Sequence, residues 1–169
     1  PGVKTIKKFP AKKNIILFVG KLNHTKGYDI YNDAISRFLK KNKTWKGIAV
    51  GSESRRLIKK NKSIVELGEI SNKKVLQLIS ESKITVACSR WDEPLGRLPI
   101  ESASRGSFPI VSNKGGLIET LTEDFSILKK NNSDELLKKI TFLTNNPKKL
   151  SSMQKNIFKK FNYSLEKTS

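Results

Sequence analysis

Three loops of this sequence combine glycine with charged residues, and each follows an apolar run. The first spans residues 20–27 (GKLNHTKG), where two glycines permit tight turns and Lys21 and Lys26 offer positive charge. A helix beginning after this loop would add free backbone N–H groups, which bind anions. The loop therefore suits a phosphate. It is neither a Walker A sequence nor a complete Gly-x-Gly-x-x-Gly motif, so an ordinary surface turn explains it equally well.

The second loop spans residues 89–103 (SRWDEPLGRLPIESA) and holds Glu93 and Glu101, which are separated by seven residues. We place Glu93 in the loop and Glu101 about two turns into the following helix. Carboxylates accept hydrogen bonds from sugar hydroxyls, and the amides around Gly96 at the helix start would face an anion. A polyol joined to a phosphate fits both features. A capped helix with exposed acids is the simpler alternative, and Trp91 either covers a ligand or packs the loop.

The third loop, residues 112–119 (SNKGGLIE), contains paired glycines and could lead into a short helix, although a tight turn explains it equally well. The sequence has one histidine and one cysteine, and no clustered metal ligands. We therefore interpret His24 as a plain loop residue and Cys88 as a small buried hydrophobe.

Short apolar runs alternate with amphipathic stretches along the chain, a pattern typical of βα units and a parallel sheet of about six strands. Because ligands bind beyond the carboxyl ends of such strands, the three loops should meet at one edge of the sheet. The strands are expected at 14–20, 45–51, 63–67, 84–88, 109–112 and 125–128. The helices are expected at 27–41, after a cap at Ser71, at 99–105, after a cap at Ser133, and from Pro147 onward.

With 169 residues and 36% hydrophobic content, the chain can bury one ordinary core. We expect a basic N-terminal arm (1–13), one domain (14–163) and a polar tail (164–169). Because the first residue is Pro1, an upstream part is expected. No apolar run is long enough to span a membrane, no signal peptide is indicated, and the single cysteine favours a reducing cytoplasm.

The formal charge of +19 allows three kinds of partner: nucleic acid, an acidic membrane surface or a phosphorylated substrate. The excess is mostly lysine scattered along the chain rather than gathered in one block. A solvated, lysine-rich surface is therefore favoured over a specific polyanion site.

In this order, the motifs GKL…KG at 20–27, LGEI at 67–70, Ser89…EPLG…ESA and GGLIE at 115–119 resemble the C-terminal domain of the large "group 1" family of retaining glycosyltransferases. The resemblance covers roughly residues 15–163, and its most specific part is the Glu-(seven residues)-Glu spacing. It implies a Rossmann-like α/β three-layer sandwich, which is one half of a GT-B fold.

The resemblance also implies roles for individual residues. Lys21 and Lys26 would hold the donor diphosphate, Glu93 the transferred sugar and Glu101 the ribose hydroxyls. The remaining contacts would be Leu95, Gly96, Arg97 and Leu98 near the sugar and phosphates, with Ile70 and Asn72 beside the base. The substrate would be a UDP- or GDP-sugar, with no cofactor and no metal. Lys21 stands where arginine is common, and Arg97 where an apolar residue is more usual.

The resemblance implies transfer of a hexose, with retention, to a glycan or lipid-linked acceptor in cell-surface polysaccharide biosynthesis. The acceptor site belongs to an N-terminal GT-B domain that this chain lacks, so the fragment is expected to be inactive alone. We expect a cytoplasmic protein that binds no nucleic acid, and peripheral contact with an acidic inner membrane face stays open. The rivals are a basic α/β nucleic-acid-binding module and a GT-B nucleotide-sugar epimerase.

Overall fold

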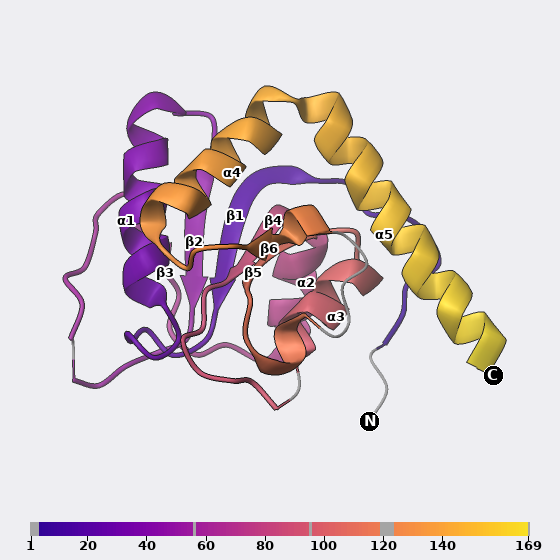
Figure 1. Ribbon diagram of the computed structural model, residues 1–169, viewed down its shortest axis with the longest axis horizontal. Helices are drawn as coiled ribbons and strands as arrows, with labels where there is room; N and C mark the ends of the chain where they lie inside the picture. Colours follow the sequence, from indigo (N-terminus) through magenta and orange to yellow (C-terminus); the bar gives the residue numbers. More distant parts are fainter. Residues whose placement is uncertain (1–3, 56, 95, 119–123, 169) are drawn as a thin grey trace.

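A computed structural model describes residues 4–55, 57–94, 96–118 and 124–168, with side chains described up to residue 161. Six parallel strands form one sheet in the order β3-β2-β1-β4-β5-β6, with helices on both faces (Figure 1). This confirms the predicted Rossmann-like α/β sandwich.

The strands are β1 (Lys13–Val19), β2 (Lys46–Val50), β3 (Ile64–Glu66), β4 (Ser82–Ala87), β5 (Phe108–Ser112) and β6 (Ile127–Leu128). The helices are α1 (Tyr28–Lys41), α2 (Asn72–Glu81), α3 (Arg97–Ser104), α4 (Ser133–Asn145) and α5 (Pro147–Thr168), with 3-10 turns η1 (Gly115–Leu117) and η2 (Asp124–Ser126).

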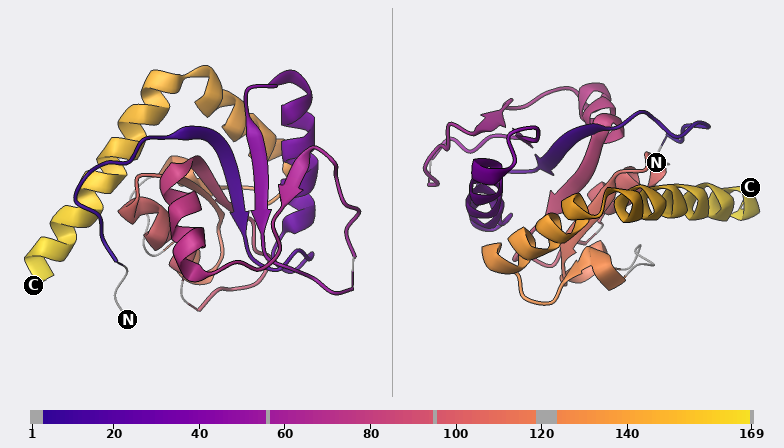
Figure 2. Two further views of the ribbon diagram at one scale, coloured as in Figure 1. Left: turned by 180° about the vertical axis from the view of Figure 1, so that it is seen from behind. Right: turned by 90° about the horizontal axis from the view of Figure 1, so that it is seen from above.

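The sheet separates two apolar layers. Ile16 and Phe18 of β1 pack into the larger core with α1, α4 and the first half of α5. Ile15 and Leu17, which alternate with them, pack into a smaller core with α2. Figure 2 shows α2 on the side of the sheet opposite α4. A strand buried on both faces needs a continuous apolar run, which is why IILFV was readable as a strand.

Most helix starts agree with the predictions. The Ser71 hydroxyl caps α2 by accepting a hydrogen bond from the Lys74 N–H, and Pro147 is the first residue of α5. The cap of α4 is Asn132 and not Ser133, because the Asn132 side chain accepts from the Glu135 N–H at 2.9 Å. Helix α3 begins at Arg97, two residues earlier than expected. Pro99, the third residue of α3, is tolerated because the backbone N–H groups of the first helical turn have no acceptor within the helix, so proline loses no hydrogen bond there.

The described part of the N-terminal arm lies against the domain. The Phe9 ring meets the Phe158 ring of α5 edge-on at 5.5 Å, and the Lys12 ammonium donates to the carbonyls of Ser80 and Arg105 at 2.7 and 2.6 Å. Both chain ends therefore lie on the α5 side of the molecule, as Figure 1 shows.

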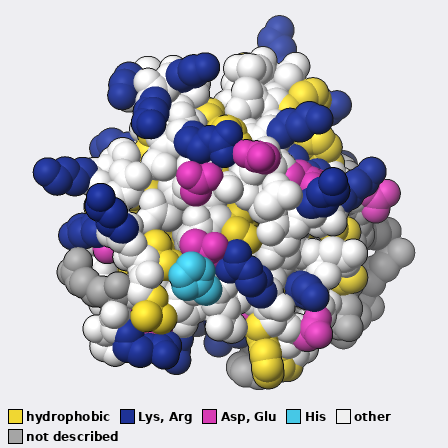
Figure 3. Space-filling view, turned by 60° about the vertical axis from the view of Figure 1, so that its left-hand side comes forward, with side chains coloured by type: hydrophobic (Ala, Val, Ile, Leu, Met, Phe, Trp, Pro, Cys, Tyr) yellow, Lys and Arg dark blue, Asp and Glu magenta, His cyan; other side chains and the backbone are white. Residues whose placement is uncertain are grey.

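Cys88 is fully buried, as expected, and burial raises the pKa of its thiol. None of the described helices combines the length and apolar character needed to cross a bilayer. Figure 3 shows lysine and arginine side chains scattered over one face, with a few carboxylates between them.

Candidate functional site

The carboxyl ends of β1, β4 and β5 open at one edge of the parallel sheet, and a cleft of about 430 Å³ lies there. Its walls come from the loop after β1, the start of α2, the loop and helix after β4, and η1 after β5. The lining residues are Phe18, Val19, Gly20, Lys26, Ile70, Asn72, Val75, Ala87, Ser89, Glu93, Gly96, Arg97, Leu98, Glu101 and Leu117.

Lys26 and Glu93 form an ion pair at this cleft. The ammonium lies 2.5 Å from Glu93 Oε1, and the two side chains are 32% and 20% exposed. The pair joins the loop after β1 to the loop after β4, which lie 67 residues apart in sequence. A cation and a hydroxyl acceptor therefore stand side by side on the cleft wall.

The position of Lys26 is set by its loop. The Asn23 side chain is buried, accepts a hydrogen bond from the Lys26 N–H at 3.0 Å and donates to Glu53 at 3.1 Å. Gly27 follows with φ of 73°, and a Cβ at this position would lie 2.0 Å from the Cys88 carbonyl oxygen. Only glycine lets the loop approach β4 this closely, so Lys26 is held beside the end of that strand.

Glu101 enters the cleft from α3. The residue is only 7% exposed, and its Oε1 accepts from Arg97 Nη2 at 3.2 Å, one turn earlier on the helix. The Arg97 side chain is 68% exposed, so solvent screens the charge of this pair. Glu101 is thus a largely buried acceptor with an exposed partner at the surface.

The described residues of the third loop (112–119) pack against those of the second loop (89–103). The Gly116 N–H donates to the Glu93 carbonyl at 2.7 Å, and a Cβ on Gly96 would lie 2.6 Å from the Gly116 carbonyl oxygen. A Cβ on Gly115 would come within 2.8 Å of the Glu93 amide nitrogen. The paired glycines therefore allow η1 to press against the segment that carries Glu93.

The structure brings together eight of the residues selected from the sequence. They are Lys26, Ile70, Asn72, Glu93, Gly96, Arg97, Leu98 and Glu101. Lys21 is exposed at the start of its loop and is not among the lining residues, while Leu95 and Glu119 lie outside the described residues. The sequence interpretation placed Ser89 in the second loop without giving it a role, and it missed Ala87. Their position at the end of β4 was the available signal, since the cleft follows the strand ends.

His24 lies in the first loop but does not line the cleft. Its Nδ1 is 3.5 Å from Asp29, which Arg90 holds with two hydrogen bonds of 2.7 and 2.8 Å. Burial alone would raise the pKa of the Asp29 carboxyl, but these bonds outweigh burial and lower it. Within the described residues, no three His, Cys, Asp or Glu side chains are grouped as metal ligands.

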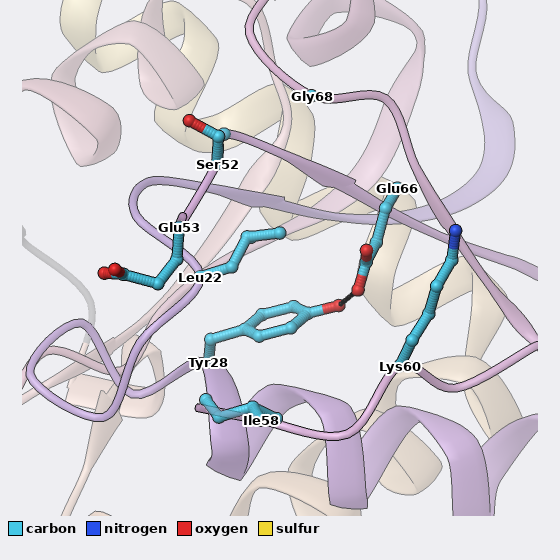
Figure 4. A pocket seen from close by; sticks show the side chains of 9 residues that line it. Leu22, Tyr28, Ser52, Glu53, Ile58, Lys60, Glu66 and Gly68 are labelled. Carbon is cyan, nitrogen blue, oxygen red and sulfur yellow. Dashed lines mark hydrogen bonds between the residues drawn. The ribbon is translucent and has the colours of Figure 1, made fainter. Parts of the chain in front are cut away.

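A second cavity of about 250 Å³ lies beside the same loop, at the ends of β2 and β3. The Tyr28 hydroxyl donates to Glu66 at 2.8 Å across it (Figure 4), and burial, with Glu66 adding to it, raises the pKa of that phenol. Leu22 and Ile58 give it apolar walls. None of the residues selected from the sequence lines this cavity.

The model of the family described as glycosyl transferases group 1 matches residues 3–160. Granule-bound starch synthase 1 of Pisum sativum is 27% identical over 121 residues, covering 66% of this chain and 19% of that protein. Spore coat protein SA of Bacillus subtilis (strain 168) is 29% identical over 125 residues, covering 66% of this chain and 33% of that protein. The chain thus spans a third or less of the length of each of these relatives.

Solved structures share the fold. The C-terminal domain of a group 1 glycosyl transferase (LpcC) from Francisella tularensis has a TM-score of 0.76 at 21% identity, with 89% of this chain and 85% of that chain covered. Anabaena Alr3699/HepE, in complex with UDP-glucose, has a TM-score of 0.71 at 18% identity, with 92% and 49% covered.

Proposed function

This chain belongs to the glycosyl transferases of group 1, and from that premise we propose that it is the donor-binding half of an enzyme that transfers a hexose from a UDP- or GDP-sugar. The observation that carries the proposal is the meeting of Lys26, Glu93 and Glu101 in one 430 Å³ cleft at the carboxyl edge of the sheet. The Anabaena relative in complex with UDP-glucose supports the choice of ligand class.

Each of the three charged side chains binds a different part of the donor in this proposal. The Lys26 ammonium binds the diphosphate, and the neighbouring Glu93 carboxylate accepts from hydroxyls of the sugar. Glu101, on α3, accepts from the ribose hydroxyls. Ile70 and Asn72, at the β3 to α2 connection, border the base. Lys21, exposed on the loop of Lys26, approaches the diphosphate from outside the cleft.

The backbone at the start of α3 completes the site. Gly96 is the N-cap of α3, and Arg97 and Leu98 lie in its first turn, where N–H groups without helical acceptors can bind an anion. Leu95 precedes them and shares this role in the proposal. Arg97 also adds a cation, and its exposed side chain can turn from Glu101 toward a phosphate.

The proposed reaction separates the sugar from a nucleoside diphosphate with retention of anomeric configuration. As the bond between the anomeric carbon and the diphosphate oxygen breaks, negative charge develops on the leaving group and Lys26 stabilises it. A fixed ammonium can do this without a metal. Glu93 holds the sugar so that its anomeric carbon faces the incoming acceptor hydroxyl.

Acceptor binding is assigned to a second domain. We propose that residues 14–163 form the donor domain, that residues 1–13 form an arm toward the acceptor domain, and that residues 164–169 form a polar tail. The isolated chain would then bind donor without transferring sugar. A glycan or lipid-linked acceptor at the cytoplasmic face of a membrane, reached through peripheral contact with acidic lipid, is the setting we propose.

Calorimetric titration of UDP, GDP and UDP-glucose into the purified chain tests the proposal. We expect saturable binding that Lys26→Ala and Glu101→Ala each weaken about tenfold, because each removes a charged hydrogen-bonding partner. Lys129→Ala/Lys130→Ala, a double substitution of exposed lysines outside the cleft, is the control. Binding that neither cleft variant weakens would remove the site assignment, and binding of nucleic acid without nucleotide binding would favour the rival function.

A further inference from the structure

A cavity of about 520 Å³ lies at the opposite edge of the sheet from the donor cleft, where the strands begin. The N-terminal arm, the starts of β2 and β4, the end of α4 and the first turns of α5 surround it, and it shares no lining residue with the donor cleft. Four of its lining residues are lysines: Lys8, Lys12, Lys83 and Lys155.

No acidic side chain of the described residues lines this cavity. Among the described residues none of the four lysines takes part in an ion pair, whereas nearby Lys13 is paired with Glu81 at 3.5 Å. In a protein with 34 basic and 15 acidic residues, Lys8, Lys83 and Lys155 gather around one hollow without an acidic partner among the described residues. Lys12 adds less charge, because burial and the nearby Arg105 charge lower its pKa to about 7. Such an arrangement raises the local concentration of anions.

Neutral groups contact three of these lysines. Lys83 donates to the Asn14 side chain at 2.6 Å and lies 5.4 Å from the centre of the Trp45 ring. Lys12 and Lys155 lie 5.4 and 6.0 Å from the centre of the Phe9 ring. Carbonyls, amides and ring faces orient an ammonium group without cancelling its charge. The positive charge is therefore positioned and also available to a ligand.

The cavity also offers hydroxyl groups. Ser151 and Thr144 line it from α5 and α4, next to the lysines. Ammonium groups that donate from several directions, combined with neutral hydroxyls, match the tetrahedral set of acceptor oxygens on a phosphate. A planar carboxylate would be better served by the fork of an arginine, and none of the arginines that the structure describes lines the cavity.

We propose that this lysine-lined cavity is a second ligand site, which binds a phosphate group. The phosphate belongs either to a soluble phosphorylated compound or to the headgroup of an anionic phospholipid, and both present the same oxygens to the lysines. The site is independent of donor binding. Some of the lysines that are scattered along the sequence thus form one specific anion site, which cannot be recognised from their positions in the sequence.

Inorganic phosphate titrated into the full chain tests the proposal, followed by NMR of the two tryptophan indole N–H groups. Trp45 lines the cavity, so phosphate bound there should shift its signal, while Trp91, on the exposed loop that carries Glu93, reports separately on phosphate bound at the donor cleft. Lys8→Ala/Lys155→Ala, a double substitution of exposed residues, should weaken this binding about tenfold while circular dichroism stays unchanged. Lys129→Ala/Lys130→Ala removes the same charge elsewhere and should bind phosphate like the wild type.

Sedimentation with phosphatidylcholine vesicles, with and without phosphatidylglycerol, separates the two sources. Binding only to the anionic vesicles, lost in Lys8→Ala/Lys155→Ala, would assign the site to a lipid headgroup. A Trp45 response to phosphate without vesicle binding would assign it to a soluble compound. The proposal is overturned if neither phosphate nor vesicles distinguish wild type from the cavity variant, or if the control variant loses as much binding.

Discussion

The Lys26 ammonium lies 2.5 Å from the Glu93 carboxylate, so the cation proposed for the diphosphate and the acceptor proposed for the sugar neutralise each other in this structure. Both side chains are mostly shielded from water, which makes the pair stronger than an exposed one. A donor that binds here has to share or replace this contact. Its diphosphate would compensate Lys26 and its sugar hydroxyls would compensate Glu93.

Glu93→Gln should separate these two contributions. Loss of the carboxylate frees Lys26, so we expect UDP to bind as tightly as to wild type or a few-fold more tightly. UDP-glucose should lose any affinity that it has beyond UDP, because an amide accepts fewer hydroxyl bonds than a carboxylate. Calorimetry with both ligands measures the difference. Equal weakening of the two by this substitution would contradict the assignment of Glu93 to the sugar.

Glu101→Gln should discriminate between ligands in another way. If the Glu101 carboxylate accepts from ribose hydroxyls, the variant should bind UDP about tenfold more weakly and pyrophosphate as well as wild type does. The residue is 7% exposed and glutamine has nearly its shape, so packing should persist. Thermal unfolding of the variant checks this. Pyrophosphate affinity that falls along with UDP affinity would point instead to a general effect on the cleft.

Gly27 and Gly68 offer a matched pair of substitutions. Their φ angles are 73° and 69°, but a Cβ at Gly27 would meet the Cys88 carbonyl oxygen at 2.0 Å, whereas a Cβ at Gly68 meets nothing within 4 Å. Gly68→Ala should cost only the strain of the left-handed backbone, about 1 kcal/mol of unfolding free energy. Gly27→Ala adds a clash between main chains and should cost about 3 kcal/mol or more. Urea unfolding compares the two, and similar losses would mean that the loop shifts freely.

The sequence predicted the sheet and its loops because their determinants are local. An apolar run such as IILFV specifies a buried strand, and Ser71 caps a helix through a bond to a residue three positions on. Glu101 could be placed on a helix for the same reason, because helix formation depends on residues close in sequence. The prediction of Ser133 as the N-cap was wrong because the neighbouring Asn132 caps helices equally well, and its side chain makes the capping hydrogen bond.

The sequence predicted that the three loops meet at one edge of the sheet, but not which side chains of distant segments contact each other. The Lys26–Glu93 pair spans 67 residues and depends on Gly27 packing against β4. The lysine-lined cavity draws its charges from the arm, β4 and α5, so no window of sequence contains it. The composition shows an excess of lysine, but the fold determines which lysines lie around one cavity.

Lys12 should make the stability of the protein depend on pH. Burial, with the nearby Arg105 charge adding to it, lowers the pKa of its ammonium to about 7. In the unfolded chain the group stays protonated to near its ordinary pKa of about 10.5. Between these values the unfolded state binds more protons, so this residue makes the free energy of unfolding rise with pH, by about 1.4 kcal/mol per pH unit at most.

Lys12→Met isolates that contribution, because other groups with shifted pKa values, such as Tyr28, Cys88 and Lys139, are present in both proteins and contribute equally to both slopes. Methionine fills a similar volume but leaves the Ser80 and Arg105 carbonyls without their donor, so the variant should be less stable overall. The readout is therefore the slope. From neutral pH to about two units above it, urea unfolding should show a steeper gain for wild type than for Lys12→Met, while Lys8→Met, at an exposed position of the same arm, should follow wild type. Parallel slopes for wild type and Lys12→Met would mean that Lys12 keeps its proton in the folded protein.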